Sequence, residues 1–109
     1  MKQWRVVLSE SAKTDIRNVH DYIAFELLSP ESASMQTSRI LDAIERLADF
    51  PEKYPLCRIA ELKNMGLRAV SAGRQRVFYS IIENSDTILI VRVLYERRDA
   101  AKAFLEELQ

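Results

Sequence analysis

The chain has 109 residues, of which 48% are apolar and 29% charged, and its 16 basic residues balance 16 acidic ones. A chain of this length holds one hydrophobic core, so we expect a single domain over residues 1–109. Its one cysteine, Cys57, excludes an internal disulfide, and no apolar run approaches the ~20 residues of a membrane-spanning helix. We therefore expect a cytoplasmic protein that spans no membrane.

The first half of the chain predicts one strand and a helix hairpin. Apolar residues alternate over residues 3–8, as in a strand with one buried face. Over residues 10–28 they recur every three or four positions, which is typical of an amphipathic helix, and Ser9 is placed to cap it. Ser29 and Pro30 then cap and open a second helix to about residue 49. The short connection makes the two helices antiparallel.

The second half predicts a loop, three strands and a last helix. Residues 51–66 show no period and are expected to form a loop with a short turn of structure. The expected strands cover residues 67–71, 74–82 and 87–95, with a hairpin turn at 83–86, and the helix covers about 98–108 with Asp99 in its first turn. The order β-α-α-β-β-β-α predicts an α+β fold. An N-terminal strand and an antiparallel helix hairpin accompany an antiparallel sheet, followed by a short C-terminal helix.

Arginine is the only basic residue type between Asn64 and Ala101. The six residues are Arg68, Arg74, Arg76, Arg92, Arg97 and Arg98. Arginine grips carboxylate or phosphate with two hydrogen bonds and stacks on aromatic rings, so this usage favours a surface that binds a partner. The alternative is that these arginines only solubilise the edge of the sheet.

Strand alternation predicts which residues share a face of the sheet. The face against the helices is expected to hold Gln75, Val77, Tyr79, Ile81, Leu89, Val91, Val93 and Tyr95. The opposite face is expected to hold Arg74, Arg76 and Arg92 with Phe78, Ile88, Ile90 and Leu94. This register requires an odd number of residues in the hairpin loop, for example Asn84–Asp86. A face that mixes arginines with apolar residues needs cover from the C-terminal helix or from a partner.

The chain resembles the toxins of the RelE/ParE superfamily over essentially its whole length. Residues 76–81, 88–94 and 97–99 are similar to the C-terminal half of these toxins. Residues 9–12, 15–16, 22–23, 29–31, 33 and 47–51 are similar to the helix hairpin of the ParE-like branch. The order and spacing of these motifs place the chain closer to that branch.

The resemblance implies the toxin half of a type II toxin–antitoxin pair. Its partner would be a cognate antitoxin, often acidic, in a toxin–antitoxin hetero-oligomer. Toxins of the ParE kind block DNA gyrase, whereas those of the RelE kind cleave messenger RNA on the ribosome. A third possibility is an interaction module of the same fold without toxicity. We assign target or antitoxin binding to Arg68, Arg74, Arg76, Phe78, Arg92, Arg97 and Arg98.

A RelE-like activity would be a metal-independent endoribonuclease, and the resemblance matches Arg76 to an arginine that contacts substrate phosphate. Arg97 or Arg98 roughly matches a second such arginine. Cleavage through the RNA 2′-hydroxyl also needs a proton acceptor and a proton donor. Arginine stays protonated and serves poorly as either. The nearby candidates are Tyr95, Glu96, Asp99 and Tyr79.

We expect Tyr79 to face the core, which leaves the nuclease constellation incomplete. The sequence therefore favours the ParE-like interpretation, with arginines that bind a protein and no catalytic residues. His20, the only histidine, has no second ligand at metal-binding spacing, and no nucleotide-binding motif is present. The sequence thus predicts no metal and no cofactor.

Overall fold

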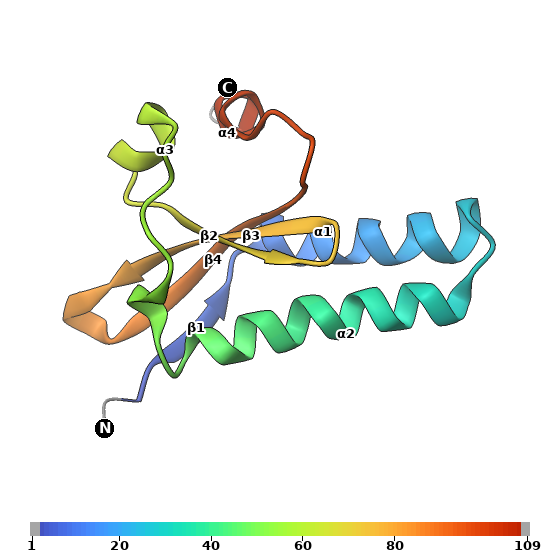
Figure 1. Ribbon diagram of the computed structural model, residues 1–109, viewed down its shortest axis with the longest axis horizontal. Coiled ribbons are helices and arrows are strands. Elements are labelled where there is room, and N and C mark those ends of the chain that lie inside the picture. Colours follow the sequence, from blue (N-terminus) through green and yellow to red (C-terminus); the bar gives the residue numbers. More distant parts are fainter. Residues whose placement is uncertain (1–2, 108–109) are drawn as a thin grey trace.

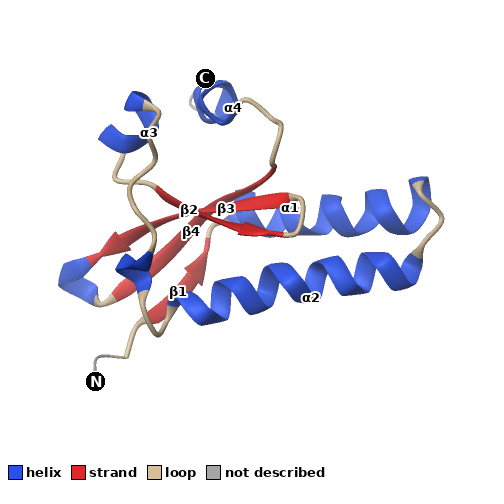
Figure 2. Ribbon diagram, in the orientation of Figure 1, coloured by secondary structure: helices blue, strands red, loops and turns tan. Residues whose placement is uncertain are grey.

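The computed structural model describes residues 3–107, in which a four-stranded sheet lies between two layers of helices (Figures 1 and 2). The helix hairpin α1–α2 covers one face, and the short helices α3 and α4 lie over the other. The strands are β1 (Arg5–Leu8), β2 (Arg68–Ala72), β3 (Gln75–Ile82) and β4 (Thr87–Tyr95). The helices are α1 (Glu10–Asp21), a π-helix (Tyr22–Glu26), α2 (Pro30–Leu47), α3 (Ala60–Asn64) and α4 (Ala100–Glu107). Single 3-10 turns cover Pro51–Lys53 and Glu83–Ser85.

The sheet has the order β1-β4-β3-β2, and β1 pairs with β4 in parallel while the other pairs are antiparallel. The predicted α+β fold and the element order are confirmed. The three later strands form the expected antiparallel sheet, and the first strand, whose pairing the sequence left open, adds to its edge in parallel. Alternation within a strand reports which face is buried but not the direction of its neighbour, and the neighbour of β1 lies at the other end of the chain.

The sequence predicted the start of one helix of the hairpin correctly and the cap of the other incorrectly. Ser9 caps α1 as expected, since its Oγ accepts a hydrogen bond from the Ala12 amide at 3.0 Å. Pro30 opens α2, but the Ser29 hydroxyl donates to the Ser32 hydroxyl at 2.7 Å and accepts no backbone amide of the helix. The predicted Ser29 cap is therefore wrong. The expected loop at 51–66 contains the short helix α3, which is too brief to show a period.

A β-bulge at Val91 changes which residues of β4 face the helix hairpin. Phe78 pairs with Arg92 and Tyr79 pairs with Ile90, so Val91 is an extra residue with no partner on β3. The hairpin loop holds four residues, not an odd number, because Ile82 pairs with Thr87. Because of the four-residue loop, the side chains from Thr87 to Ile90 lie on the face opposite to the expected one. The bulge returns the residues from Arg92 onward to their expected faces.

Because of the bulge, the predicted faces of the sheet are correct only in part. Val77, Tyr79 and Val93 pack against the hairpin as predicted, whereas Phe78 and Leu94 pack on the opposite face. Ile88 and Ile90 were expected beside the arginines but are fully buried in the hairpin core. Val91 packs on the arginine side instead.

The arginine side of the sheet has its own small core, to which α4 and the segment around α3 contribute. Phe78 and Leu94 pack there against Cys57, Leu62, Leu67, Ala100, Ala103 and Phe104. Asp99 lies just outside α4 and not in its first turn, because its Oδ1 accepts the Lys102 amide at 3.0 Å as an N-cap. The predicted end of this helix at Leu108 lies outside the described residues. α4 thus covers part of the face that we expected to need cover.

We predict that the turn between β2 and β3 tolerates no side chain at Gly73. Its φ is +63°, and a Cβ would lie 2.4 Å from Oε1 of Gln36, whose buried amide donates to the Ala72 carbonyl at 2.8 Å and to the Gln75 side chain. Gly66 has a similar φ of +73° with open space around it. Gly66→Ala should cost about 1 kcal/mol, and Gly73→Ala about 2–4 kcal/mol, because it also displaces buried hydrogen bonds. Urea unfolding measures both, and equal losses would contradict the proposed role of Gln36.

Candidate functional site

Arg76 lies on the face of the sheet that α3 and α4 cover, which we call the second face. It pairs with Ser71 on β2 and with Leu94 on β4, and its guanidinium carbon lies 5.0 Å from the centroid of the Phe78 ring. The Phe78 ring meets Phe104 of α4 edge-on, with ring centroids 5.6 Å apart. This packing fixes the aromatic platform on which the half-buried Arg76 side chain rests.

A cavity of about 310 Å³ opens beside Arg76, between the β2–β3 pair and the segment that leads into α3. Its lining is Pro55, Leu56, Cys57, Arg58, Ile59, Leu62, Ala69 and Arg76. Two arginines thus line an otherwise largely apolar cavity, which we call the Arg76 pocket. Such a lining suits a carboxylate carried next to an apolar side chain, because arginine grips the acid while the walls exclude water.

The residues of α3 and the segment before it were missed by sequence reasoning, although they form most of the Arg76 pocket. Arg58 and Leu62 lie in the stretch without a period, and their approach to the sheet depends on long-range contacts. One such contact is the Cys57 amide, which donates to the Leu67 carbonyl at 2.8 Å. Burial raises the pKa of the Cys57 thiol, and the nearby Arg76 charge opposes that rise.

The other predicted arginines do not all join Arg76. Arg68 points to the opposite face, where its guanidinium donates to the Tyr54 carbonyl, so it ties the loop before α3 to the sheet. Arg74 is exposed in the β2–β3 turn, and Arg97 and Arg98 are exposed in the corner after β4. Arg98 lies 3.8 Å from Glu106 of α4. The second face therefore presents Arg76, with Arg74, Arg97 and Arg98 exposed near its end.

Arg92 pairs with Phe78 in the sheet, as expected, but its guanidinium is held by Asp15 of α1. Its Nε lies 2.7 Å from Asp15 Oδ2 and its Nη2 lies 2.9 Å from Asp15 Oδ1, and Asp15 Oδ2 also accepts the Val93 amide at 2.9 Å. Both side chains are nearly buried, with 12% and 11% of their surface exposed. This two-pronged ion pair engages the guanidinium, so Arg92 adds no fully exposed cation beside Arg76.

The candidate proton carriers lie away from Arg76 or have other roles. Tyr79 is fully buried on the hairpin face as predicted, and its hydroxyl donates to the Pro51 carbonyl at 2.6 Å. Tyr95 pairs with Gln75, so it too belongs to the hairpin face. Asp99 caps α4, and Glu96 is exposed with its amide donating to the Arg74 carbonyl at 2.8 Å. Among the described carboxylates near the end of β4, the Glu96 side chain is the one with no structural role.

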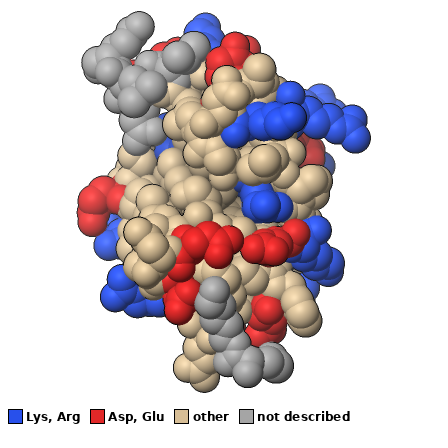
Figure 3. Space-filling model, turned by 90° about the vertical axis from the view of Figure 1, so that its left-hand side faces the viewer, with Lys and Arg blue, Asp and Glu red and all other residues tan. Residues whose placement is uncertain are grey.

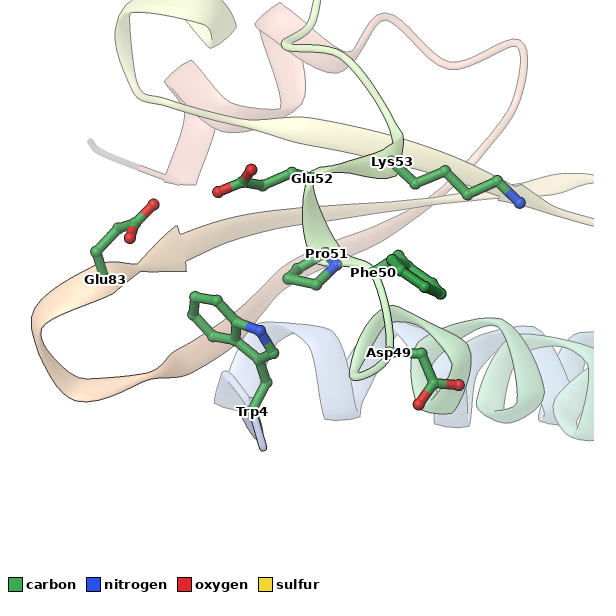
Figure 4. A pocket seen from close by; sticks show the side chains of 7 residues that line it. All are labelled: Trp4, Asp49, Phe50, Pro51, Glu52, Lys53 and Glu83. Carbon is green, nitrogen blue, oxygen red and sulfur yellow. The ribbon is translucent and has the colours of Figure 1, made fainter. Parts of the chain in front are cut away.

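A larger cavity of about 560 Å³ lies at the opposite end of the hairpin from its turn (Figure 4). It is lined by Trp4, Asp49, Phe50, Pro51, Glu52, Lys53 and Glu83. The Glu52 and Glu83 side chains point toward one another above the Trp4 ring (Figure 4), and acidic side chains form a band across this end of the molecule (Figure 3). None of the predicted site residues lines this cavity.

Within residues 3–107, no three His, Cys, Asp or Glu side chains gather closely enough to hold a metal ion. In that same part of the chain, no helix combines the length and the apolar character that crossing a bilayer requires. The chemistry that the Arg76 pocket offers is thus anion binding by guanidinium groups on an aromatic and apolar base.

Comparison with known folds identifies the architecture as that of the RelE/ParE toxins. A chain of the chromosomal ParDE toxin–antitoxin system from P. aeruginosa matches with a TM-score of 0.70 at 14% identity, over 85% of this chain and 96% of that chain. A chain of the RelBE2 toxin–antitoxin complex from Mycobacterium tuberculosis matches with a TM-score of 0.61 at 18% identity, over 86% and 99%. The isolated E. coli RelE toxin matches with a TM-score of 0.61 at 11% identity, over 96% and 97%.

Sequence comparison gives the family directly. Residues 6–100 match the ParE toxin of the parDE type II toxin–antitoxin system. The chain belongs to the ParE toxin family, which confirms the resemblance drawn from its strand and hairpin motifs. A search among curated proteins gave no significant match.

We predict that breaking the Asp15–Arg92 pair strongly destabilises the fold. Asp15→Ala leaves a nearly buried guanidinium without its carboxylate and should cost about 3–5 kcal/mol of unfolding free energy. Lys13→Ala is the control, because it removes the exposed Lys13–Glu10 pair, at 3.2 Å, and should cost less than about 0.5 kcal/mol. Chemical denaturation followed by circular dichroism measures both. A loss at Asp15 as small as that at Lys13 would show that the pair contributes little.

A second prediction concerns alkaline pH. Burial raises the pKa of Tyr79 from 10.0 to about 12, so the folded state favours the neutral phenol. The stability from this group is complete below pH 10.0 and is lost as the pH rises through about 12. Near-ultraviolet absorbance should show one tyrosine that ionises near pH 12, and Tyr79→Phe should remove that component. Its persistence in Tyr79→Phe would assign it to another tyrosine.

Proposed function

We propose that this protein is a ParE-like toxin that poisons DNA gyrase and is neutralised by a cognate antitoxin. The observation that carries the proposal is a half-buried arginine in a largely apolar pocket whose lining, among the described residues, includes none of the candidate proton carriers Tyr79, Tyr95, Glu96 and Asp99. A surface of this kind binds a protein group firmly but lacks the donor and acceptor that RNA cleavage requires.

The distribution of the arginines supports binding over cleavage. A nuclease must gather several cations around one phosphorane to stabilise its charge. Here Arg68 binds the loop before α3, and Arg92 binds helix α1. Arg76 and Arg58 are the arginines that line the pocket. The apolar walls fit a protein side chain better than a charged ribose-phosphate backbone.

The same pocket offers a binding mode for the antitoxin. An antitoxin segment with an acidic side chain beside an apolar one would pair its carboxylate with Arg76 and lay the apolar group on the pocket walls. Arg74, Arg97 and Arg98 would add longer-range attraction at the rim, which salt screens. Toxin and antitoxin then form a hetero-oligomer in which the arginine face is covered.

The alternative function is a RelE-like endoribonuclease that acts on messenger RNA at the ribosome. The half-buried position of Arg76 on an aromatic ring favours it, because such a guanidinium is fixed well enough to hold a phosphate. Its catalysts would be Arg76, Arg97 and Arg98 with Glu96 or Tyr95. The burial of Tyr79 and the place of Tyr95 on the hairpin face weigh against it.

We predict that the purified protein inhibits supercoiling by DNA gyrase and leaves messenger RNA intact in a translation extract. Arg76→Ala should weaken gyrase inhibition at least tenfold, which corresponds to about 1.4 kcal/mol of binding free energy. The matched control is Arg46→Ala, which removes an exposed arginine of α2 that does not line the pocket. Unchanged supercoiling together with cut transcripts would favour the ribonuclease, and Arg76→Ala should then abolish cutting outright.

A further inference from the structure

The helix hairpin ends in an exposed apolar tip that projects well beyond the sheet (Figure 1). Five large apolar side chains there are more than half exposed: Tyr22, Phe25, Leu27, Leu28 and Met35. Phe25 is 70% exposed and Leu28 is 82% exposed. We call these five residues, with the acidic Asp21, Glu26 and Glu31 beside them, the hairpin tip. A cluster of this kind on a small protein marks a surface that binds another molecule.

The backbone of the tip departs from regular helix at the same place. The chain widens from α1 into the π-helix Tyr22–Glu26, where the Leu27 amide donates to the Tyr22 carbonyl at 3.1 Å. π-helical turns are rare and occur frequently at functional sites. They shift the side chains that follow around the helix axis, so this turn sets the direction in which Phe25 and its neighbours project.

Leu28 then adopts a left-handed conformation, with φ at +53°, at the end of this helix. Glycine or asparagine occupies such a position without strain, whereas leucine does not. Its side chain contributes little to the core in return, because it is mostly exposed. A strained residue that presents its apolar side chain to solvent indicates a role in contact with a partner.

The charge of the tip restricts what that partner is. Between Asn18 and Ser38 the chain carries Asp21, Glu26 and Glu31 and no lysine or arginine. All three carboxylates are exposed. Two copies of the tip brought together would place six carboxylates at one contact, so a second copy of the chain is disfavoured. An acidic segment is disfavoured for the same reason and suits the Arg76 pocket instead.

We propose that the hairpin tip is the surface with which the toxin engages its target, a protein that offers an apolar depression surrounded by basic residues. An enzyme that binds DNA has such basic surfaces because it must hold phosphates. The inference rests on the proposed function, in which that enzyme is DNA gyrase. The tip is then a second contact with the target, in addition to the Arg76 pocket, whereas an acidic antitoxin segment meets the arginine face only.

The first test replaces the apolar side chains of the tip in the full-length chain. The double variant Phe25→Gln with Leu28→Asn removes two exposed apolar groups, and asparagine tolerates the left-handed backbone, so the melting temperature should stay unchanged or rise. The matched control is Leu41→Gln with Phe50→Gln, which removes one exposed leucine and one exposed phenylalanine outside the tip. Each is expressed from an inducible promoter in E. coli, and surviving colonies are counted.

We expect the wild type and the control to reduce survival alike. The tip variant should leave at least tenfold more surviving colonies at equal protein level and melting temperature. Full killing by a folded tip variant, or equal loss in both pairs, overturns the assignment of the tip. A wild-type chain that leaves growth unaffected overturns the toxin function and this inference together. Killing without any effect on gyrase overturns only the proposed target.

The second test probes the sign of the charge with purified E. coli DNA gyrase. Glu26→Lys with Glu31→Lys reverses two exposed tip charges and should raise the toxin concentration for half-inhibition of supercoiling at least tenfold, with a smaller effect at high salt. A photoreactive phenylalanine analogue at position 25 should crosslink to gyrase, whereas the same analogue at position 50 should not. Stronger inhibition by the charge-reversed variant, or crosslinking from position 50 alone, overturns the proposal.

Discussion

The ion pair between Asp15 and Arg92 holds the helix hairpin to the sheet at the point where the sheet loses a strand. β1 ends at Leu8, whereas β4 continues to Tyr95, so the outer edge of β4 beyond Ile90 has no strand partner. Ser9 and Asp15 supply that partner instead. The Ser9 hydroxyl donates to the Val91 carbonyl at 2.7 Å, and the Asp15 carboxylate accepts both the Val93 amide and the Arg92 guanidinium.

The bulge at Val91 makes this arrangement possible and shapes both faces of the sheet. The extra residue lets Ile88 and Ile90 fill the hairpin core while Leu94, further along β4, packs with Phe78 in the core on the other face. Without the bulge, one half of β4 would present its apolar residues to the wrong side. The second core that results holds α4 and the α3 segment in place, and these are the elements that build the Arg76 pocket. The position of the pocket therefore depends on an irregularity some distance from it.

Local sequence patterns were sufficient for the elements and for much of the core. Alternation located β3 and β4 and placed Val77, Tyr79 and Val93 correctly, because each strand buries one face. The bulge has no local signal, since neither Val91 nor Arg92 is a glycine and the alternation of β4 continues through them. The carboxylate that binds Arg92 belongs to Asp15, near the other end of the chain, so this ion pair has no signal in the local sequence. The Arg76 pocket was found only in part, because α3 is a five-residue helix without a period.

The molecule presents surfaces of opposite character at separate places. The second face of the sheet carries Arg76 over an aromatic base with further arginines near its end, whereas the hairpin tip carries exposed apolar groups among carboxylates. Most of the hairpin is held by the core and by the Asp15–Arg92 pair, so it forms a stiff arm that carries the tip away from the sheet (Figure 1). A stiff arm reduces the entropy lost when its tip docks into a depression on a partner. The strain at Leu28 is tolerated at the end of such an arm because the packed helices behind it determine the backbone there. The sheet and the arm therefore present two separate binding surfaces around a single small core.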